Sequence, residues 1–191
     1  MKSAQENLSR LKKNIEQVIF GKSETIDLAV TCLLARGHLL IEDVPGVGKT
    51  SLAHCLANSL QLDFKRIQFT NDLLPADITG VSIYDQEEKC FHFQKGPLFA
   101  NIVLADEINR STPRTQSALL EAMNEKQISA DNNTYLLDDP FMVIATQNLI
   151  ESQGAYPLPE SQLDRFMFYM SMGYPSQDDE RRLLQEQSIR P

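Results

Sequence analysis

The sequence predicts an α/β fold in which a five-stranded, mainly parallel sheet lies between layers of helices. Short apolar runs suited to buried strands alternate with helix-like segments, and this alternation is typical of parallel sheets covered on both faces. The runs lie at residues 38–42, 64–69, 101–105, 141–145 and 166–170. The 191 residues suit one domain, alone or with a fragment of a second.

Two helices are expected before the first strand. In the first helix, apolar residues recur at helical spacing, and the helix should end near Gly21. These apolar residues are Leu8, Leu11, Ile15, Val18 and Ile19. The second helix should begin with Ser23 as its cap and run to Gly37.

The later helices are clearest at residues 50–60 and 113–123, between predicted strands. Two other stretches, 82–95 and 126–138, are predicted to form β-hairpin inserts, because turn-forming polar residues separate short β-like arms. They interrupt an otherwise regular alternation of strands and helices.

The end of the chain differs from the rest. Residues 175–191 are acidic and helix-prone, with little apolar surface of their own. We therefore expect a core at residues 1–174, followed by a linker and the start of another domain.

Composition argues against nucleic-acid binding and membrane insertion. The chain has 26 acidic and 18 basic residues, a net charge of −8, which opposes attraction to phosphate backbones. No apolar run is long enough to span a bilayer, and the N-terminus lacks the apolar core of a signal peptide. A cytoplasmic protein is expected.

The cysteines and histidines are scattered along the sequence. They are Cys32, Cys55, Cys90, His38, His54 and His92. The cysteines lie in or beside apolar stretches, so we expect reduced core thiols and no metal site or disulfide framework. We likewise expect structural roles for the histidines.

The stretch EDVPGVGKTS, residues 42–51, predicts a phosphate-binding loop between a buried strand and a helix. The N–H groups and dipole of a helix start favour an anion, and Gly46 and Gly48 let the backbone approach phosphate oxygens. Lys49 would reach the β- and γ-phosphates, and the Thr50 hydroxyl would ligate Mg²⁺. The usual pattern has glycine where Asp43 stands, so an ordinary glycine-rich turn is the alternative.

A pair of acids follows the strand at 101–105. Asp106 could hold the metal shell, and Glu107 could activate a water for in-line attack on the γ-phosphate. A solvated acidic pair is the alternative. After the next strand come Thr146, Gln147 and Asn148, whose side chains could hydrogen-bond the γ-phosphate or that water.

The order of these motifs along the chain is informative. In an open parallel sheet, ligands bind beyond the carboxyl ends of the strands. Three strand ends carry a phosphate loop, an acidic pair and polar amides, so one γ-phosphate could touch all three. This combination favours a nucleotide site over chance.

Six longer motifs resemble those of the MoxR family of AAA+ ATPases. They are HLLIEDVPGVGKT, RIQFTNDLLPADITG, GPLFANIVLADEINR, TQSALLEAMNEKQIS, VIATQN and YPLPESQLDRF, and they cover most of residues 11–174. The resemblance implies a P-loop AAA+ core with strand order 5-1-4-3-2 and binding of ATP or ADP with Mg²⁺. It also implies a hexameric ring that acts as a chaperone-like machine, in many cases with a partner that carries a von Willebrand factor A domain.

Site residues also follow from the resemblance. It implies phosphate contacts from Pro45, Gly46, Val47, Gly48, Lys49, Thr50 and Ser51, Walker B acids at Asp106 and Glu107, and a first sensor at Asn148, with Gln147 as an alternative. Asp43 should then point away from the phosphates and bond N–H groups of the loop.

The resemblance also assigns roles to three further residues. Arg165 is similar to an arginine finger that enters the neighbouring subunit's site, the alternative being an ion pair with Asp164 or Glu160. Ile19 and Gly21 resemble the segment that lines the adenine pocket in this family, and plain core packing is their alternative.

The resemblance also implies that both hairpins face the ring's pore or the partner, and that the family's helical lid is largely absent from this chain. We therefore expect the chain to be a piece of a longer one. Alternative functions are a nucleotide-regulated scaffold with little turnover, a magnesium-chelatase-type motor subunit, and use of GTP in place of ATP.

Overall fold

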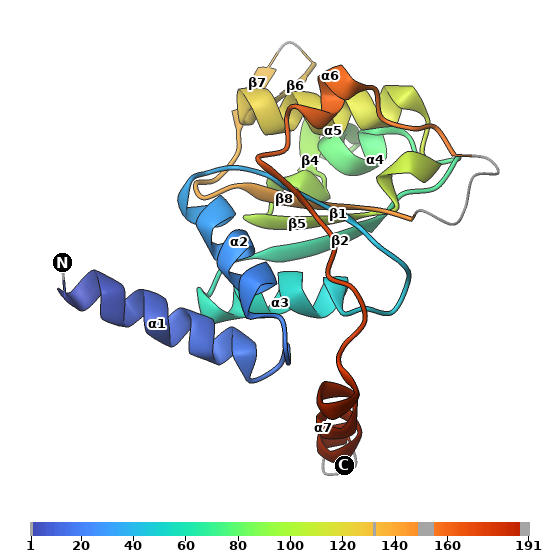
Figure 1. The fold of residues 1–191 in the computed structure, drawn as a ribbon. Helices are drawn as coiled ribbons and strands as arrows, with labels where there is room; N and C mark the ends of the chain where they lie inside the picture. Colours follow the sequence, from blue (N-terminus) through green and yellow to red (C-terminus); the bar gives the residue numbers. More distant parts are fainter. Residues whose placement is uncertain (1, 132, 149–154, 188–191) are drawn as a thin grey trace.

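The computed structural model describes residues 2–131, 133–148 and 155–187, arranged as a sheet between two layers of helices (Figure 1). The helices are α1 (Lys2–Glu16), α2 (Ser23–Leu34), α3 (Lys49–Ser59), α4 (Pro75–Thr79), α5 (Pro113–Glu125), α6 (Glu160–Leu163) and α7 (Gln177–Gln187), with short 3-10 helices η1 (Pro97–Phe99) and η2 (Ile108–Arg110). The strands are β1 (Leu39–Glu42), β2 (Phe64–Gln68), β3 (Gly80–Asp85), β4 (Cys90–Lys95), β5 (Ile102–Asp106), β6 (Gln127–Ala130), β7 (Asn133–Leu136), β8 (Met142–Gln147) and β9 (Phe168–Met170).

The main sheet has five parallel strands in the order β2-β5-β8-β1-β9. This is the predicted order 5-1-4-3-2, read from the other edge, so the fold prediction is confirmed. The register places Gln68 opposite Asp106, and Glu42 opposite Gln147. Neighbouring strands therefore end close together at one edge of the sheet.

Alternate residues of the central strands pack into two separate cores. Leu40, Val103 and Val143 belong to one core with side chains of α4 and α5. Residues that precede or follow them on the strands, such as Leu39 and Ile144, belong to the other core with side chains of α1, α2 and α3. Burial on both faces explains why these strands read as continuous apolar runs.

The two predicted hairpins are present as separate two-stranded sheets, β3–β4 and β6–β7. Tyr84 pairs with Phe91, and Ile83 lies opposite His92. The hairpins contact each other where Phe93 stacks on Tyr135, with ring centroids 4.2 Å apart.

Some predicted details of the helices and strands are wrong. Helix α1 ends at Glu16, well before Gly21, and Val18 is 38% exposed because the chain turns there. Ser23 is the first residue of α2 and makes no capping hydrogen bond, since Lys22 takes the cap position. The fifth strand is confined to Phe168–Met170 at the sheet edge.

The cysteines differ from one another. Cys32 is buried, and burial raises the pKa of its thiol to about 12. Cys55 is half-buried, whereas Cys90 is exposed on β4. The prediction of a core thiol is therefore wrong for Cys90, because this residue lies on a hairpin that projects from the core.

His38 has the structural role that was predicted for it. Its Nδ1 accepts a hydrogen bond from the Val143 N–H at 3.0 Å, so Nε2 carries the proton and donates it to the Met123 carbonyl at 3.2 Å. The imidazole is buried and joins β8 to α5. Within the described part of the chain, the helices are all too short or too polar to cross a bilayer.

Candidate functional site

The loop between β1 and α3 has the backbone shape that its glycines permit. Gly46 (φ +88°) and Gly48 (φ +97°) both lie in the left-handed region, which other residues rarely adopt. Helix α3 begins directly after Gly48, and the first N–H groups of a helix lack intrahelical partners. The loop thus ends at a helix start that can receive an anion.

Lys49 is held over this loop. Its ammonium donates hydrogen bonds to the carbonyls of Val44 at 2.9 Å and Asp43 at 3.2 Å. The positive charge of Lys49 therefore lies at the beginning of the loop that leads into α3.

Asp43 fastens the loop to the segment after β9. One carboxylate oxygen accepts hydrogen bonds from the Met172 and Gly173 N–H groups at 2.7 Å and from the Ser171 hydroxyl at 3.0 Å. The other accepts from the Val44 N–H at 2.9 Å. Burial would raise the pKa of this carboxyl, but these hydrogen bonds outweigh burial and hold its pKa below the usual range. Asp43 thus bonds one N–H group of the loop, that of Val44, as predicted, and its other partners lie in the segment after β9.

The carboxylate of Asp106, at the end of β5, is engaged on both oxygens. Oδ1 accepts a hydrogen bond from the Thr146 hydroxyl at 2.6 Å. Oδ2 accepts from Nη2 of Arg66 at 2.6 Å and from its Nε at 3.2 Å. The side chain is therefore fixed in orientation by the two neighbouring strands, β8 and β2.

Glu107 follows Asp106 with a left-handed backbone (φ +57°). Its Oε2 accepts hydrogen bonds from Gln68 at 2.9 Å and Arg110 at 3.1 Å. Its N–H donates to the Thr146 hydroxyl at 2.9 Å. Thr146 therefore links the two acids, and its contact with a phosphate or water stays a prediction.

One cavity of about 350 Å³ lies at the carboxyl ends of the strands, within the size range of small-molecule sites. It is lined by Pro45, Gly46, Gly48, Lys49, Thr50, Ser51, Arg66, Gln68, Asp106, Glu107, Thr146, Gln147 and Asn148. The loop, the acidic pair and the polar run thus surround the same space. The sequence analysis did not predict that Arg66 and Gln68 line the site. The predicted pairing of their strand with the strand that ends in Asp106 was the signal that could have indicated them.

Ile19 and Gly21 do not line this cavity. Ile19 is 6% exposed and packs in the core on the α1–α3 face. Gly21 has φ +68° and packs against the Asp179 carboxylate, which would have to move to make room for a side chain at this position. Neither residue is among the described residues that line the cavity.

Arg165 is exposed and lies in a different hollow of about 290 Å³, together with residues of α5 such as Glu121 and Glu125. Although Glu160 and Asp164 are described, neither forms an ion pair with Arg165 within the described residues. Arg165 therefore does not contribute to the cavity of its own chain.

The comparisons agree with this geometry. The model of the ATPase family associated with various cellular activities (AAA) matches residues 38–168. A crystal structure of a predicted ATPase from Cytophaga hutchinsonii superposes with a TM-score of 0.87 at 43% identity, covering 98% of this chain and 59% of that one. The fold and site thus define a P-loop ATPase domain of the AAA+ class.

Relatives identify the family within this class. The chain is 44% identical over 184 residues to Chaperone MoxR1 of Mycobacterium tuberculosis, covering 96% of this chain and 49% of the relative. It is 55% identical over 177 residues to the uncharacterized protein YeaC of Bacillus subtilis, covering 93% and 55%. The chain belongs to the MoxR family of AAA+ ATPases, and it spans about half the length of these relatives.

Proposed function

We propose that this chain is the nucleotide-binding core of a Mg²⁺-dependent ATPase that remodels or activates a protein partner. The observation that carries the proposal is that the loop at 45–51, the acids Asp106 and Glu107, and Asn148 meet at one cavity. Within the loop, Val47 does not line the cavity and packs against the core on the α3 face. These groups come from three strand ends, so their meeting depends on the whole sheet. A chance glycine-rich turn would not be accompanied by the other two sets.

Phosphate binding would use the loop and Lys49. The helix-start N–H groups would hold phosphate oxygens, and the Lys49 ammonium would exchange its loop carbonyls for the β- and γ-phosphates. Thr50 and Asp106 offer a hydroxyl and a carboxylate, an oxygen donor set that suits Mg²⁺. When bound, the ion would neutralise charge on the phosphates.

Glu107 would act as the base that orients and activates the attacking water. Gln68 and Arg110 both bond its Oε2, so the water would be oriented by Oε1, or by Oε2 after exchange of one of these partners. Asn148 is proposed as the first sensor, with Gln147 as the alternative. Both line the cavity next to the acids.

Assembly into a ring would complete the site. Arg165 is exposed and lies outside the cavity of its own chain, which suits a residue that acts on a neighbouring subunit. We propose a cytoplasmic hexamer whose arginine finger stabilises charge on the transferring phosphoryl group. The name of the chaperone relative supports a protein client, for which a von Willebrand factor A protein is our candidate.

The test is the substitution Glu107→Gln in a chain of the relatives' full length. The amide is the same size as the carboxylate but cannot accept the proton, so steady-state phosphate release should fall by about 10² to 10⁴ while ATP affinity is kept. Glu24→Gln is the control, because Glu24 is exposed on α2 and does not line the cavity, and it should leave turnover unchanged. Equal turnover in the Glu107→Gln and wild-type proteins would overturn the mechanism.

A further inference from the structure

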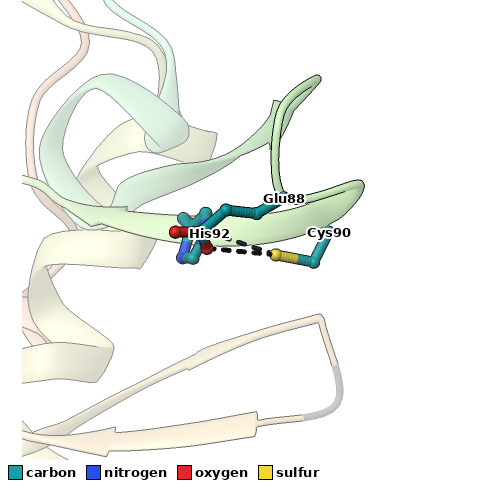
Figure 2. Close-up of side chains that lie close together, drawn as sticks. All are labelled: Glu88, Cys90 and His92. Atoms are coloured by element: carbon teal, nitrogen blue, oxygen red, sulfur yellow. Dashed lines mark hydrogen bonds and ion pairs between the residues drawn. The ribbon is translucent and has the colours of Figure 1, made fainter.

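The β3–β4 hairpin carries a cluster of three potential metal ligands that the proposed ATPase site does not use. Glu88, Cys90 and His92 lie at its tip, and their ligand atoms are all within 4.8 Å of one another (Figure 2). Within the described residues, these three are the His, Cys, Asp or Glu side chains that lie close enough together to surround one ion.

The local backbone explains why the three side chains meet. Cys90 and His92 are two residues apart on β4, so they lie on one face of the strand. The turn between Asp85 and Cys90 is shaped by the left-handed backbone of Lys89 (φ +54°). Asp85 also accepts hydrogen bonds from the Glu87 and Glu88 N–H groups at 2.7 and 3.0 Å. This turn brings Glu88 back over the same face.

The distances suit a small ion in tetrahedral geometry. Ligand bond lengths of about 2.0–2.3 Å around zinc place neighbouring N, O and S ligands roughly 3.4–3.6 Å apart. The Cys90 sulfur lies 3.2 Å from His92 Nε2 and 3.7 Å from Glu88 Oε2. The remaining pair, His92 Nε2 and Glu88 Oε2, is joined by a hydrogen bond of 2.7 Å. Replacing that hydrogen bond with an ion requires a movement of less than about 1 Å.

We propose that Glu88, Cys90 and His92 form a site for a divalent transition-metal ion, with Zn²⁺ as the expected occupant. A thiolate, an imidazole and a carboxylate are all ligands that zinc takes, whereas Mg²⁺ and Ca²⁺ select oxygen ligands alone. On binding, the Cys90 thiol loses its proton to solvent and the His92 proton moves to Nδ1, which leaves the Nε2 lone pair for the metal. Water completes the coordination, because the three side chains are exposed.

The charge around the tip also favours a cation. Asp85, Glu87 and Glu88 surround the turn, against the single positive charge of Lys89. A bound ion would tie the turn to β4 and so hold the hairpin in one conformation. The site lies outside the nucleotide cavity, and its existence does not depend on ATP hydrolysis.

Cobalt(II) titration of the reduced chain tests the proposal, because cobalt occupies zinc sites and a cobalt–thiolate bond gives a charge-transfer absorption band. One equivalent of Co²⁺ should produce this band in the wild-type chain, and one equivalent of Zn²⁺ should remove it. Cys90→Ser should abolish the band. His92→Ala and Glu88→Gln should each weaken the affinity about tenfold or more, since even changes around the ligands cost about 10- to 100-fold.

Cys55→Ser is the matched control, because Cys55 lies on α3 away from the hairpin, and its band should equal that of the wild type. The oxygen ligands of the nucleotide cavity would give no thiolate band, so Co²⁺ bound in that cavity is distinguished from Co²⁺ bound at the hairpin. Absence of the band at one equivalent would overturn the proposal. So would a band that persists in Cys90→Ser, or one ion bound for every two chains.

Discussion

The edge of the sheet and the tip of the β3–β4 hairpin both gather side chains that can bind ligands, but they do so by different means. At the sheet edge, Asp106 meets Thr146 and Arg66, each 40 residues away in the sequence. At the hairpin tip, the three side chains lie within residues 88–92. The first arrangement therefore depends on the folded core, and the second on one turn.

This difference predicts how each region responds to change. Around the cavity, contacts between strands link Arg66, Gln68, Asp106, Glu107 and Thr146, so a substitution there should affect stability, turnover or both. The hairpin tip is exposed and is linked locally, so it can change without unfolding the core. The cavity also lacks Arg165, which lies elsewhere on the chain, whereas the hairpin cluster is complete within one chain.

The largest effect is expected for Arg165→Ala in a chain of the relatives' full length. If Arg165 completes a neighbour's site, turnover should fall by about 10³ to 10⁵, the usual contribution of an arginine finger. Mixing this variant with Lys49→Ala should restore part of the activity, because some interfaces then pair an intact loop with an intact arginine.

Arg10→Ala, an exposed arginine on α1, is the control and should keep wild-type turnover. Failure of the two variants to complement each other at every mixing ratio would contradict action between subunits. The cavity would then be self-contained, as the hairpin cluster is.

The next largest effect, a loss of stability, is expected for Asp43→Ala, and Asp85→Ala is the variant with which it is compared. Both carboxylates accept backbone N–H groups, but Asp43 is buried and joins distant segments, whereas Asp85 bonds only its own turn. Asp43→Ala should lower the free energy of unfolding by about 2–4 kcal/mol, because it leaves buried N–H groups unpaired. Asp85→Ala should cost less than about 1 kcal/mol. Urea unfolding measures both, and equal losses would contradict the comparison.

The same carboxylate predicts an acid dependence. Because the folded state lowers the pKa of Asp43, its stabilising contribution is present above the unfolded pKa of about 3.9 and is lost as the pH falls through the folded value. Asp43→Ala should lack this part of the loss in acid.

His38 gives a comparable effect over a different pH range. Burial lowers the pKa of its imidazole to about 4, against a hydrogen bond to Met123 that raises it, and the positive charge of Lys126 lowers it further. The fold therefore favours the neutral ring, and stability should fall by about 3 kcal/mol in total as the pH drops from 6.5 to 4.

His38→Gln tests this in urea unfolding at a series of pH values. Glutamine can donate and accept hydrogen bonds but does not charge, so the fall in stability should become smaller. His92→Gln at the exposed hairpin tip is the control and should leave the fall unchanged. A wild-type pH dependence in His38→Gln would show that the buried ring is not its source.

The sequence predicted the sheet and the groups around the cavity because both follow from regular patterns. Buried strands appear as apolar runs, and the groups that follow Glu42, Ala105 and Ala145 must meet when the strands are parallel. The direct contacts were harder to predict. Arg66 and Gln68 alternate with buried residues on β2, and only the register shows that they reach Asp106 and Glu107.

The hairpin cluster shows a second limit of the sequence. Cys90 and His92 have the spacing of one strand face, but Glu88 joins them only because Lys89 adopts a left-handed backbone. The polar residues predicted a turn here, but no glycine marks the left-handed position, so the residue types did not indicate its exact shape. The early end of α1 has a similar origin, since Val18 continues the apolar pattern although the helix stops at Glu16.

In the proposed function, the cavity at the sheet edge binds the phosphates of ATP through Lys49. The most direct measurement is the affinity of the chain for a fluorescent ATP analogue with Mg²⁺, compared between the wild type, Lys49→Ala and Lys65→Ala. Lys65 is an exposed lysine on β2 and serves as the matched control. We predict that Kd rises about tenfold or more for Lys49→Ala, a loss of about 1.4 kcal/mol, and stays unchanged for Lys65→Ala. Equal affinity of the wild type and Lys49→Ala would show that Lys49 does not bind the phosphates.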